Sequence, residues 1–163
     1  MEQILKKKST VIDHKDCDGN TALHYAARNA VTEENYWSTK EDYIENAAYK
    51  NISLLINEEA SVNAENNYGQ TPLFSAVESL RSGIVEFLLT HGADTSIKDK
   101  NGFTVFHFAI KQRNMGMLNV LLPKIEDSGS IVDVLKAKES LSVIDKEGNT
   151  LLHHAIKWGC SEE

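Results

Sequence analysis

The stretch NNYGQTPLFSAV, residues 66–77, decides the fold of this chain. Its first five residues are typical of a tight turn, because Asn and Gly tolerate positive φ and an Asn side chain can bond the backbone two residues ahead. Thr71 and Pro72 then predict the start of a helix, with threonine as the N-cap and proline at the first helical position, where its missing N–H costs nothing. Apolar residues follow at helical spacing on one face. We therefore expect a turn that leads into a short amphipathic helix.

A second, more apolar helix is predicted directly downstream. The residues Arg81-Ser82-Gly83 break the first helix, and IVEFLL at 84–89 supplies the buried layer of the second. Gly92 marks its C-terminal stop. Such a helical hairpin cannot bury its own apolar face, so it must stack on copies of itself.

Those copies are present elsewhere in the chain. A glycine followed two residues later by threonine and then by a short apolar, alanine-bearing stretch occurs four times: GNTALHYAA at 19–27, GQTPLFSAV at 69–77, GFTVFHFAI at 102–110 and GNTLLHHAI at 148–156. The interval from Gly69 to Gly102 is 33 residues, a period that indicates a stacked repeat array. An Asp or Asn stands three residues before each turn glycine: Asp16, Asn66, Asp99 and Asp145.

These motifs resemble the ankyrin repeat, whose pattern includes T-P-L-H-x-A. The resemblance covers nearly the whole chain and implies an all-α ankyrin-repeat solenoid with short hairpin-like turns, about three full repeats and two half-repeats. We expect one domain over residues 1–163. Its predicted parts are a half-repeat at 1–15, repeats at 16–65, 66–98 and 99–144, and a partial terminal repeat at 145–163.

Two of the predicted repeats are longer than the 33-residue period. One insertion falls near 30–46 and is acidic and aromatic, with Trp37 among its large side chains. The other falls near 124–138. Insertions map to loops that are often functional, whereas neutral drift is the alternative because long surface loops cost little. A partner contact is a stronger hypothesis for the first insertion than for the second, because Trp37 and Tyr43 are costly to expose without packing.

Composition excludes several classes of function. The 163 residues carry a formal charge of −7 and a pI near 5.4, which argues against a nucleic-acid partner and an anionic membrane surface. No apolar run approaches the ~18 residues of a transmembrane helix. Cys17 and Cys160 are far apart and are expected to be free thiols in a reducing compartment. We expect an intracellular protein, cytoplasmic or nuclear, that acts as a monomer.

No pattern in the sequence indicates catalysis, a cofactor or a small-molecule substrate, and nucleophile and phosphate-loop motifs are absent. In the ankyrin-like pattern His24, His107 and His153 resemble structural groups that bond the backbone of neighbouring turns. The adjacent pair His153-His154 is a poor metal pair, because neighbours on a helix point to different faces. We therefore predict no metal site. Asn63 matches a place where ankyrin-like proteins can be hydroxylated, although an asparagine that holds the hairpin turn is the favoured interpretation.

The resemblance implies that turn tips and first helices form a concave binding surface. Its candidate partner-binding residues, with Trp37 added from the insertion, are Asp18, Asn20, Trp37, Tyr68, Gln70, Glu78, Asn101, Phe103, Lys111, Glu147 and Trp158. Tyr68, Phe103 and Trp158 are aromatics at positions where we expect packing not to require them, and such residues are common interface anchors. Two alternatives stay open: Phe103 could fold onto its neighbouring turn, and Trp158 could cover an incomplete end. The surface is acidic near residues 16–18 and more basic over 98–111, which predicts a charge-patterned partner.

The predicted function is a non-catalytic scaffold or adaptor that binds another protein. One alternative is the recognition segment of a larger multidomain protein, such as an enzyme, a channel or a pathogen effector. Another is a short inhibitor of Rel-type transcription factors.

Overall fold

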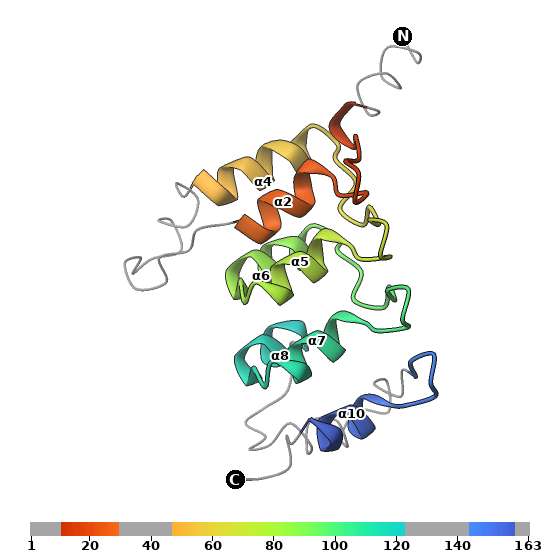
Figure 1. Ribbon diagram of the computed structural model, residues 1–163. Helices are drawn as coiled ribbons and strands as arrows, with labels where there is room; N and C mark the ends of the chain where they lie inside the picture. Colours follow the sequence, from red (N-terminus) through yellow and green to blue (C-terminus); the bar gives the residue numbers. More distant parts are fainter. Residues whose placement is uncertain (1–10, 30–46, 123–143, 159–163) are drawn as a thin grey trace. The chain divides into compact units, whose positions relative to one another are not determined.

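The computed structural model describes residues 11–29, 47–122 and 144–158, and it divides the chain into two compact units (Figure 1). Unit 1 comprises Met1–Asp94 and unit 2 comprises Thr95–Glu163. The described residues form seven helices: α2 (Ala22–Asn29), α4 (Ala47–Asn57), α5 (Pro72–Glu78), α6 (Ser82–Thr90), α7 (Val105–Lys111), α8 (Met115–Leu121) and α10 (Leu151–Lys157). Within these ranges β pairing is limited to one isolated bridge between Ile144 and Thr150. The predicted all-α class is confirmed.

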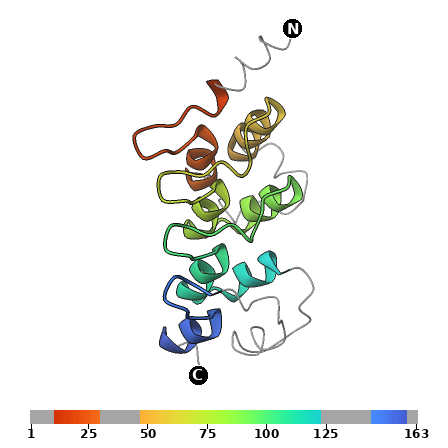
Figure 2. The same ribbon diagram turned by 90° about the vertical axis from the view of Figure 1, so that its right-hand side faces the viewer.

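The helices of each unit are arranged in two layers beside a row of turns (Figure 2). In unit 1, α2 packs against α4 and α5, and α5 pairs with α6. In unit 2, α7 packs against α8 and α10. The first helices of the repeats (α2 and α5, or α7 and α10) lie between the turns and the second helices of the same unit. Successive repeats therefore stack within each unit, as a solenoid requires.

The apolar positions predicted for the second helix largely form the core. Ile84, Val85 and Leu88 of α6 are completely buried. Phe87 is only half-buried, and its ring meets the edge of Tyr49 of α4 with the ring centroids 5.6 Å apart. The equivalent core of unit 2 is built from the buried residues Val105, Ala109, Ile110, Met117, Leu118 and Leu121.

The break between α5 and α6 comes earlier than the sequence predicted. Helix α5 ends at Glu78, and Leu80 adopts a positive φ of 58° in the link to α6. Gly83 therefore lies inside α6 rather than in the break. The Tyr49 hydroxyl occupies the position that a Cβ on Gly83 would take, so the glycine serves close packing between the helices and not chain reversal.

The four turns share one hydrogen-bond pattern. Oδ1 of Asp16 accepts bonds from the backbone N–H groups of Asp18 and Asn20, at 2.9 and 2.8 Å. The residues at the same place in the other turns accept the equivalent pair of bonds at 2.8 to 3.0 Å; they are Asn66, Asp99 and Asp145. The Asp or Asn before each turn glycine thus satisfies backbone donors that the tight turn would leave unpaired.

Successive turns are joined edge to edge within each unit. In unit 1 the Asn67 N–H donates to the Asp18 carbonyl at 2.9 Å, and in unit 2 the Lys146 N–H donates to the Asn101 carbonyl at 3.2 Å. Gly19 has a φ of 78°, and a Cβ there would lie 2.6 Å from the Asn67 nitrogen. Glycine is therefore needed at this turn both for its backbone conformation and for the approach of the next turn.

Candidate functional site

Two exposed tyrosines mark the face formed by the turns and first helices of unit 1. Tyr68 at a turn tip is 56% exposed and Tyr25 on α2 is 44% exposed. The Tyr25 hydroxyl donates to Oδ2 of Asp16 at 2.6 Å, which lowers the pKa of Asp16 and raises the pKa of Tyr25. This bond orients the Tyr25 side chain. For the Tyr68 hydroxyl, the described residues supply no hydrogen-bond partner.

The other predicted contact residues of unit 1 differ in how far they are already engaged. Asp18 is exposed at a turn tip, and Glu78 is exposed at the end of α5. Asn20 is half-buried, and its Oδ1 accepts a bond from Nδ2 of Asn66 at 2.9 Å. Gln70 is also half-buried, and its carbonyl accepts bonds from two groups of the same unit. Asn20 and Gln70 therefore help to join adjacent turns.

In unit 2, two of the predicted aromatics are packed into a ring cluster of Phe103, His107, His154 and Trp158. The Phe103 ring stacks on His107 with centroids 5.1 Å apart and meets His154 edge-on at 5.4 Å. The Trp158 ring stacks on His154 at 4.6 Å. Both aromatics are half-buried. The expectation that packing does not require Phe103 and Trp158 is therefore wrong, because the two histidines offer flat ring surfaces to cover.

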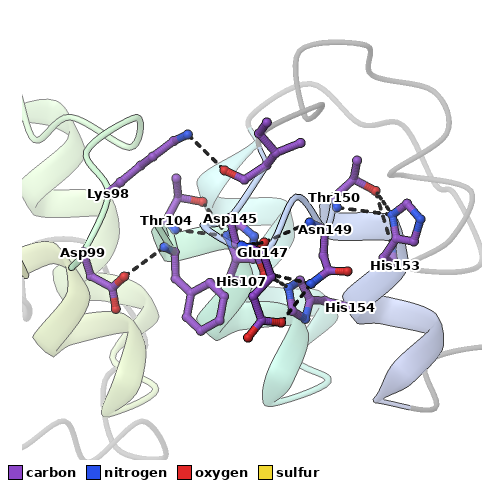
Figure 3. A network of polar contacts seen from close by, with 12 residues as sticks. Lys98, Asp99, Thr104, His107, Asp145, Glu147, Asn149, Thr150, His153 and His154 are labelled. Carbon is purple, nitrogen blue, oxygen red and sulfur yellow. Dashed lines mark hydrogen bonds and ion pairs between the residues drawn. The ribbon is translucent and has the colours of Figure 1, made fainter. Parts of the chain in front are cut away.

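A buried hydrogen bond joins His154 of the ring cluster to Asp145 (Figure 3). Nε2 of His154 and Oδ2 of Asp145 are 2.7 Å apart, and their side chains are 4% and 1% exposed. Burial alone would raise the pKa of Asp145, but bonds from His154, Asn149 and the Glu147 backbone outweigh it and hold that pKa well below its ordinary value. The turn is thereby tied to α10.

The ring cluster also contains two buried nitrogens without a hydrogen-bond partner among the described residues. They are Nε2 of His107 and Nδ1 of His154. Burial, reinforced by the neighbouring His154, lowers the pKa of His107 to about 4. His107 is therefore neutral at physiological pH.

The three motif histidines share only part of the expected role. His24 accepts a bond at Nδ1 from the Thr21 N–H at 3.1 Å and donates from Nε2 to the Gln70 carbonyl at 2.9 Å. Nδ1 of His107 and of His153 accepts the equivalent bond within its own repeat, from Thr104 at 3.0 Å and Thr150 at 3.2 Å. Among the described residues the expected bond to a neighbouring turn is found for His24 alone.

Sequence reasoning missed the structural role of His154. It treated His153 as the motif residue, yet His153 is exposed and His154 is buried. A signal was available, since Tyr25 and His154 both stand nine residues after a turn aspartate and each bonds Oδ2 of that aspartate. A side chain with a hydrogen-bond donor nine residues after a turn aspartate therefore predicts a bond to that aspartate.

The remaining predicted residues of unit 2 face solvent. Asn101, Lys111 and Glu147 are exposed; Asn101 and Glu147 also make bonds to the turn at 144–150. Trp37 lies outside the described residues.

Asn63 has a contact pattern that favours its turn-holding interpretation. Its Nδ2 donates to the Gly92 carbonyl at 3.0 Å, and its Oδ1 accepts from the Asp94 N–H at 2.9 Å. Both atoms of the side-chain amide are thus used to link two loops of unit 1.

Over residues 11–29, 47–122 and 144–158, no three His, Cys, Asp or Glu side chains are grouped as a metal ion would require. The same part of the chain holds no helix with the length and apolar character needed to cross a bilayer. Cys17 is exposed, and Cys160 is outside the described residues.

The repeat geometry agrees with the family comparison. A family model described as "Ankyrin repeats (3 copies)" matches residues 43–99 and 81–162, and one described as "Ankyrin repeat" matches residues 18–36. The chain belongs to the ankyrin-repeat family. It is a protein-interaction repeat domain, of a kind that is generally non-catalytic.

Its relatives are longer proteins. The chain is 33% identical over 162 residues to the B-cell lymphoma 3 protein homolog of Mus musculus. The matched region covers 99% of this chain and 31% of that protein. It is 29% identical over 151 residues to Protein lin-12 of Caenorhabditis elegans, covering 93% of this chain and 9% of that protein. Rabankyrin-5 of Mus musculus is 27% identical over 141 residues, 86% of this chain and 10% of that protein. The chain thus spans a third or less of each.

Proposed function

We propose that the chain is a non-catalytic scaffold that binds a partner protein through the turns and first helices of unit 1. Tyr68 and Tyr25 are its aromatic anchors, and Asp18 and Glu78 are its polar rim. The single observation that supports this most directly is the exposure of both tyrosines on a turn and helix that the unit itself holds in place.

The residues proposed to contact the partner are held in place before binding, which favours association. Large rings contribute much contact area at low entropic cost, and anchors of this kind supply most of the energy of many interfaces. Tyr25 is oriented by Asp16, and the backbone of the Tyr68 turn is held by two bonds to Asn66. Binding therefore requires little ordering of the chain. The ring cluster of unit 2 is a weaker candidate centre, because Phe103 and Trp158 already pack on histidines.

The test is affinity capture from cell extract with wild type, Tyr68→Ala and a matched control. Leu54→Ala is the control, because Leu54 is 54% exposed but lies on α4 in the layer of second helices. We expect Tyr68→Ala to weaken capture of the specific partner about thirtyfold, as for an anchor worth ~2 kcal/mol. Helical circular dichroism should be unchanged. Equal losses for Tyr68→Ala and Leu54→Ala would contradict the assignment.

Inhibition of Rel-type transcription factors is a second candidate. The match to the B-cell lymphoma 3 protein homolog along almost the whole chain partly fits it. Mixing the chain with a purified Rel-type factor and measuring complex formation by size-exclusion chromatography is the test, and two separate peaks would exclude it.

The recognition segment of a larger protein is a third candidate, supported by the small share of each relative that this chain covers. Sequencing the full transcript is its test. A reading frame confined to these residues would exclude it.

A further inference from the structure

Exposed lysines occur at the same two repeat positions in both repeats of unit 2. Lys100 and Lys146 stand two residues before the turn glycines Gly102 and Gly148, and Lys111 and Lys157 stand nine residues after them. All four side chains are exposed. We call this set the lysine ladder. The corresponding positions of unit 1 hold no lysine; they are Cys17, Asn67, Arg28 and Glu78.

The fold of unit 2 places the two lysines of each pair on adjacent elements. The turns that carry Lys100 and Lys146 are adjacent, because the Lys146 N–H donates to the carbonyl of Asn101 at 3.2 Å. Lys111 and Lys157 are the last residues of α7 and α10, which pack on each other. Like charges are thus placed side by side along two neighbouring repeats.

The described part of unit 2 has too few exposed carboxylates to balance the positive charge of the lysine ladder. Asp99 and Asp145 are 7% and 6% exposed and accept backbone bonds in their turns. Glu147 is the one exposed carboxylate in residues 95–122 and 144–158. No ion pair of a ladder lysine is found there, whereas Lys98 donates to the Ile144 carbonyl at 3.1 Å and has a structural role.

Stabilisation of helices explains only two of the four lysines of the ladder. A cation at a helix C-terminus interacts favourably with the helix dipole, which accounts for Lys111 and Lys157. Lys100 and Lys146 lie in turns, where no helix end compensates them. Two cations on touching turns, without an ion-pair partner among the described residues, favour an external anion.

We propose that the lysine ladder binds an acidic, Asp- and Glu-rich segment of the partner protein. The inference rests on the proposed function and adds a charge requirement to it. A carboxylate-bearing protein segment fits better than a nucleic acid, because the whole chain carries −7 and the described part of unit 1 holds nine Asp and Glu against four Lys and Arg. The negative charge of the rest of the chain would repel a nucleic acid that is longer than the lysine ladder. A short acidic segment that contacts only the ladder would not be repelled in this way.

The test uses the full chain and a short fluorescein-labelled peptide of alternating Glu and Ser, at low ionic strength, with fluorescence anisotropy as the readout. We expect Lys100→Gln/Lys146→Gln to weaken binding about fivefold, since each exposed pair is worth ~0.2–1 kcal/mol. The control is Arg28→Gln/Lys50→Gln, which removes two exposed cations from unit 1 and changes the net charge equally. The control should retain the wild-type affinity within about twofold.

Several results would overturn the proposal. Equal weakening by both double variants would mean that only net charge matters. Tighter binding of a single-stranded DNA of equal charge would make the ligand a nucleic acid. Dimers in analytical ultracentrifugation that disappear in Lys100→Gln/Lys146→Gln would make the occupant a second copy of the chain.

Partner capture separates this inference from the proposed function. If Tyr68→Ala abolishes capture and Lys100→Gln/Lys146→Gln leaves it unchanged, the charge requirement fails and the proposed function stands. If both variants capture as wild type does, the proposed function fails as well.

Discussion

His24 in unit 1 and His107 in unit 2 begin from the same local pattern and end in different environments. Each accepts a bond at Nδ1 from the threonine three residues earlier. His24 also donates to the carbonyl of Gln70 in the next repeat, whereas Nε2 of His107 is buried with no partner among the described residues. The repeat motif therefore determines the contact inside the repeat, and the neighbouring repeat determines the second contact.

Tyr25 and His154 show the same contrast at another repeat position. Both bond Oδ2 of their turn aspartate, at 2.6 and 2.7 Å. Tyr25 is 44% exposed and His154 is 4% exposed, because Trp158 and the edge of Phe103 pack against the His154 ring. The same type of hydrogen bond thus holds an exposed side chain, Tyr25, in unit 1 and a buried side chain, His154, in unit 2.

The largest expected change in the free energy of unfolding comes from replacing the turn glycines. Gly19 and Gly148 both have positive φ, 78° and 82°, but only the Cβ of a residue at position 19 would meet the next turn, 2.6 Å from the Asn67 nitrogen. Replacement by alanine should cost about 1–2 kcal/mol at Gly148 from the backbone conformation alone. At Gly19 the displaced turn raises the cost to about 3 kcal/mol. Urea unfolding followed by circular dichroism measures both, and equal losses would show that the turns are not in contact.

A smaller difference is expected between the two motif histidines. Phe74 already occupies this position in the second repeat, so a phenyl ring can be accommodated. His24→Phe should cost about 2 kcal/mol because the bonds to both Thr21 and the Gln70 carbonyl are lost, and His107→Phe about 1 kcal/mol because only the bonds to Thr104 are lost. The midpoint of urea unfolding gives the comparison. A His107→Phe protein that is the less stable of the two would mean that Nε2 of His107 has a partner.

The smallest expected effect is a change in the pH dependence of stability. The pKa of Asp145 is lowered in the folded state, so its contribution is complete above the ordinary value near 4 and is lost as the pH falls below it. Asp145→Asn should therefore flatten the decline in stability below pH ~4, while Asn66 shows that asparagine maintains the turn bonds.

Asp16→Asn is the matched comparison for that change. Its bond to Tyr25 also lowers its pKa, but the carboxylate is exposed and solvent screens it, so the flattening should be smaller. Urea midpoints at a series of pH values measure both variants. Identical pH profiles for wild type and Asp145→Asn would mean that the charged form of Asp145 does not stabilise the fold.

Features carried by consecutive residues were predictable from the sequence. The Asp or Asn before each turn glycine, the threonine at the N-cap position of the first helices α5, α7 and α10 and the buried face of 84–89 follow from short-range geometry, and the structure confirms these positions. The helix break was misplaced because Gly83 looks like a terminator in sequence and instead makes room for Tyr49. The candidate site was only partly predictable, since Tyr68 was identified but Tyr25 was not.

The sequence by itself determined that this chain forms short helical hairpins with an Asp- or Asn-anchored turn, because each of those features depends on residues a few positions apart. Only the tertiary structure decided that Phe103 covers His154, that His107 lacks a second bond among the described residues and that Tyr25 stays exposed. Burial depends on which side chains arrive from the neighbouring repeat, as Phe103 does for His154. No local pattern contains that information.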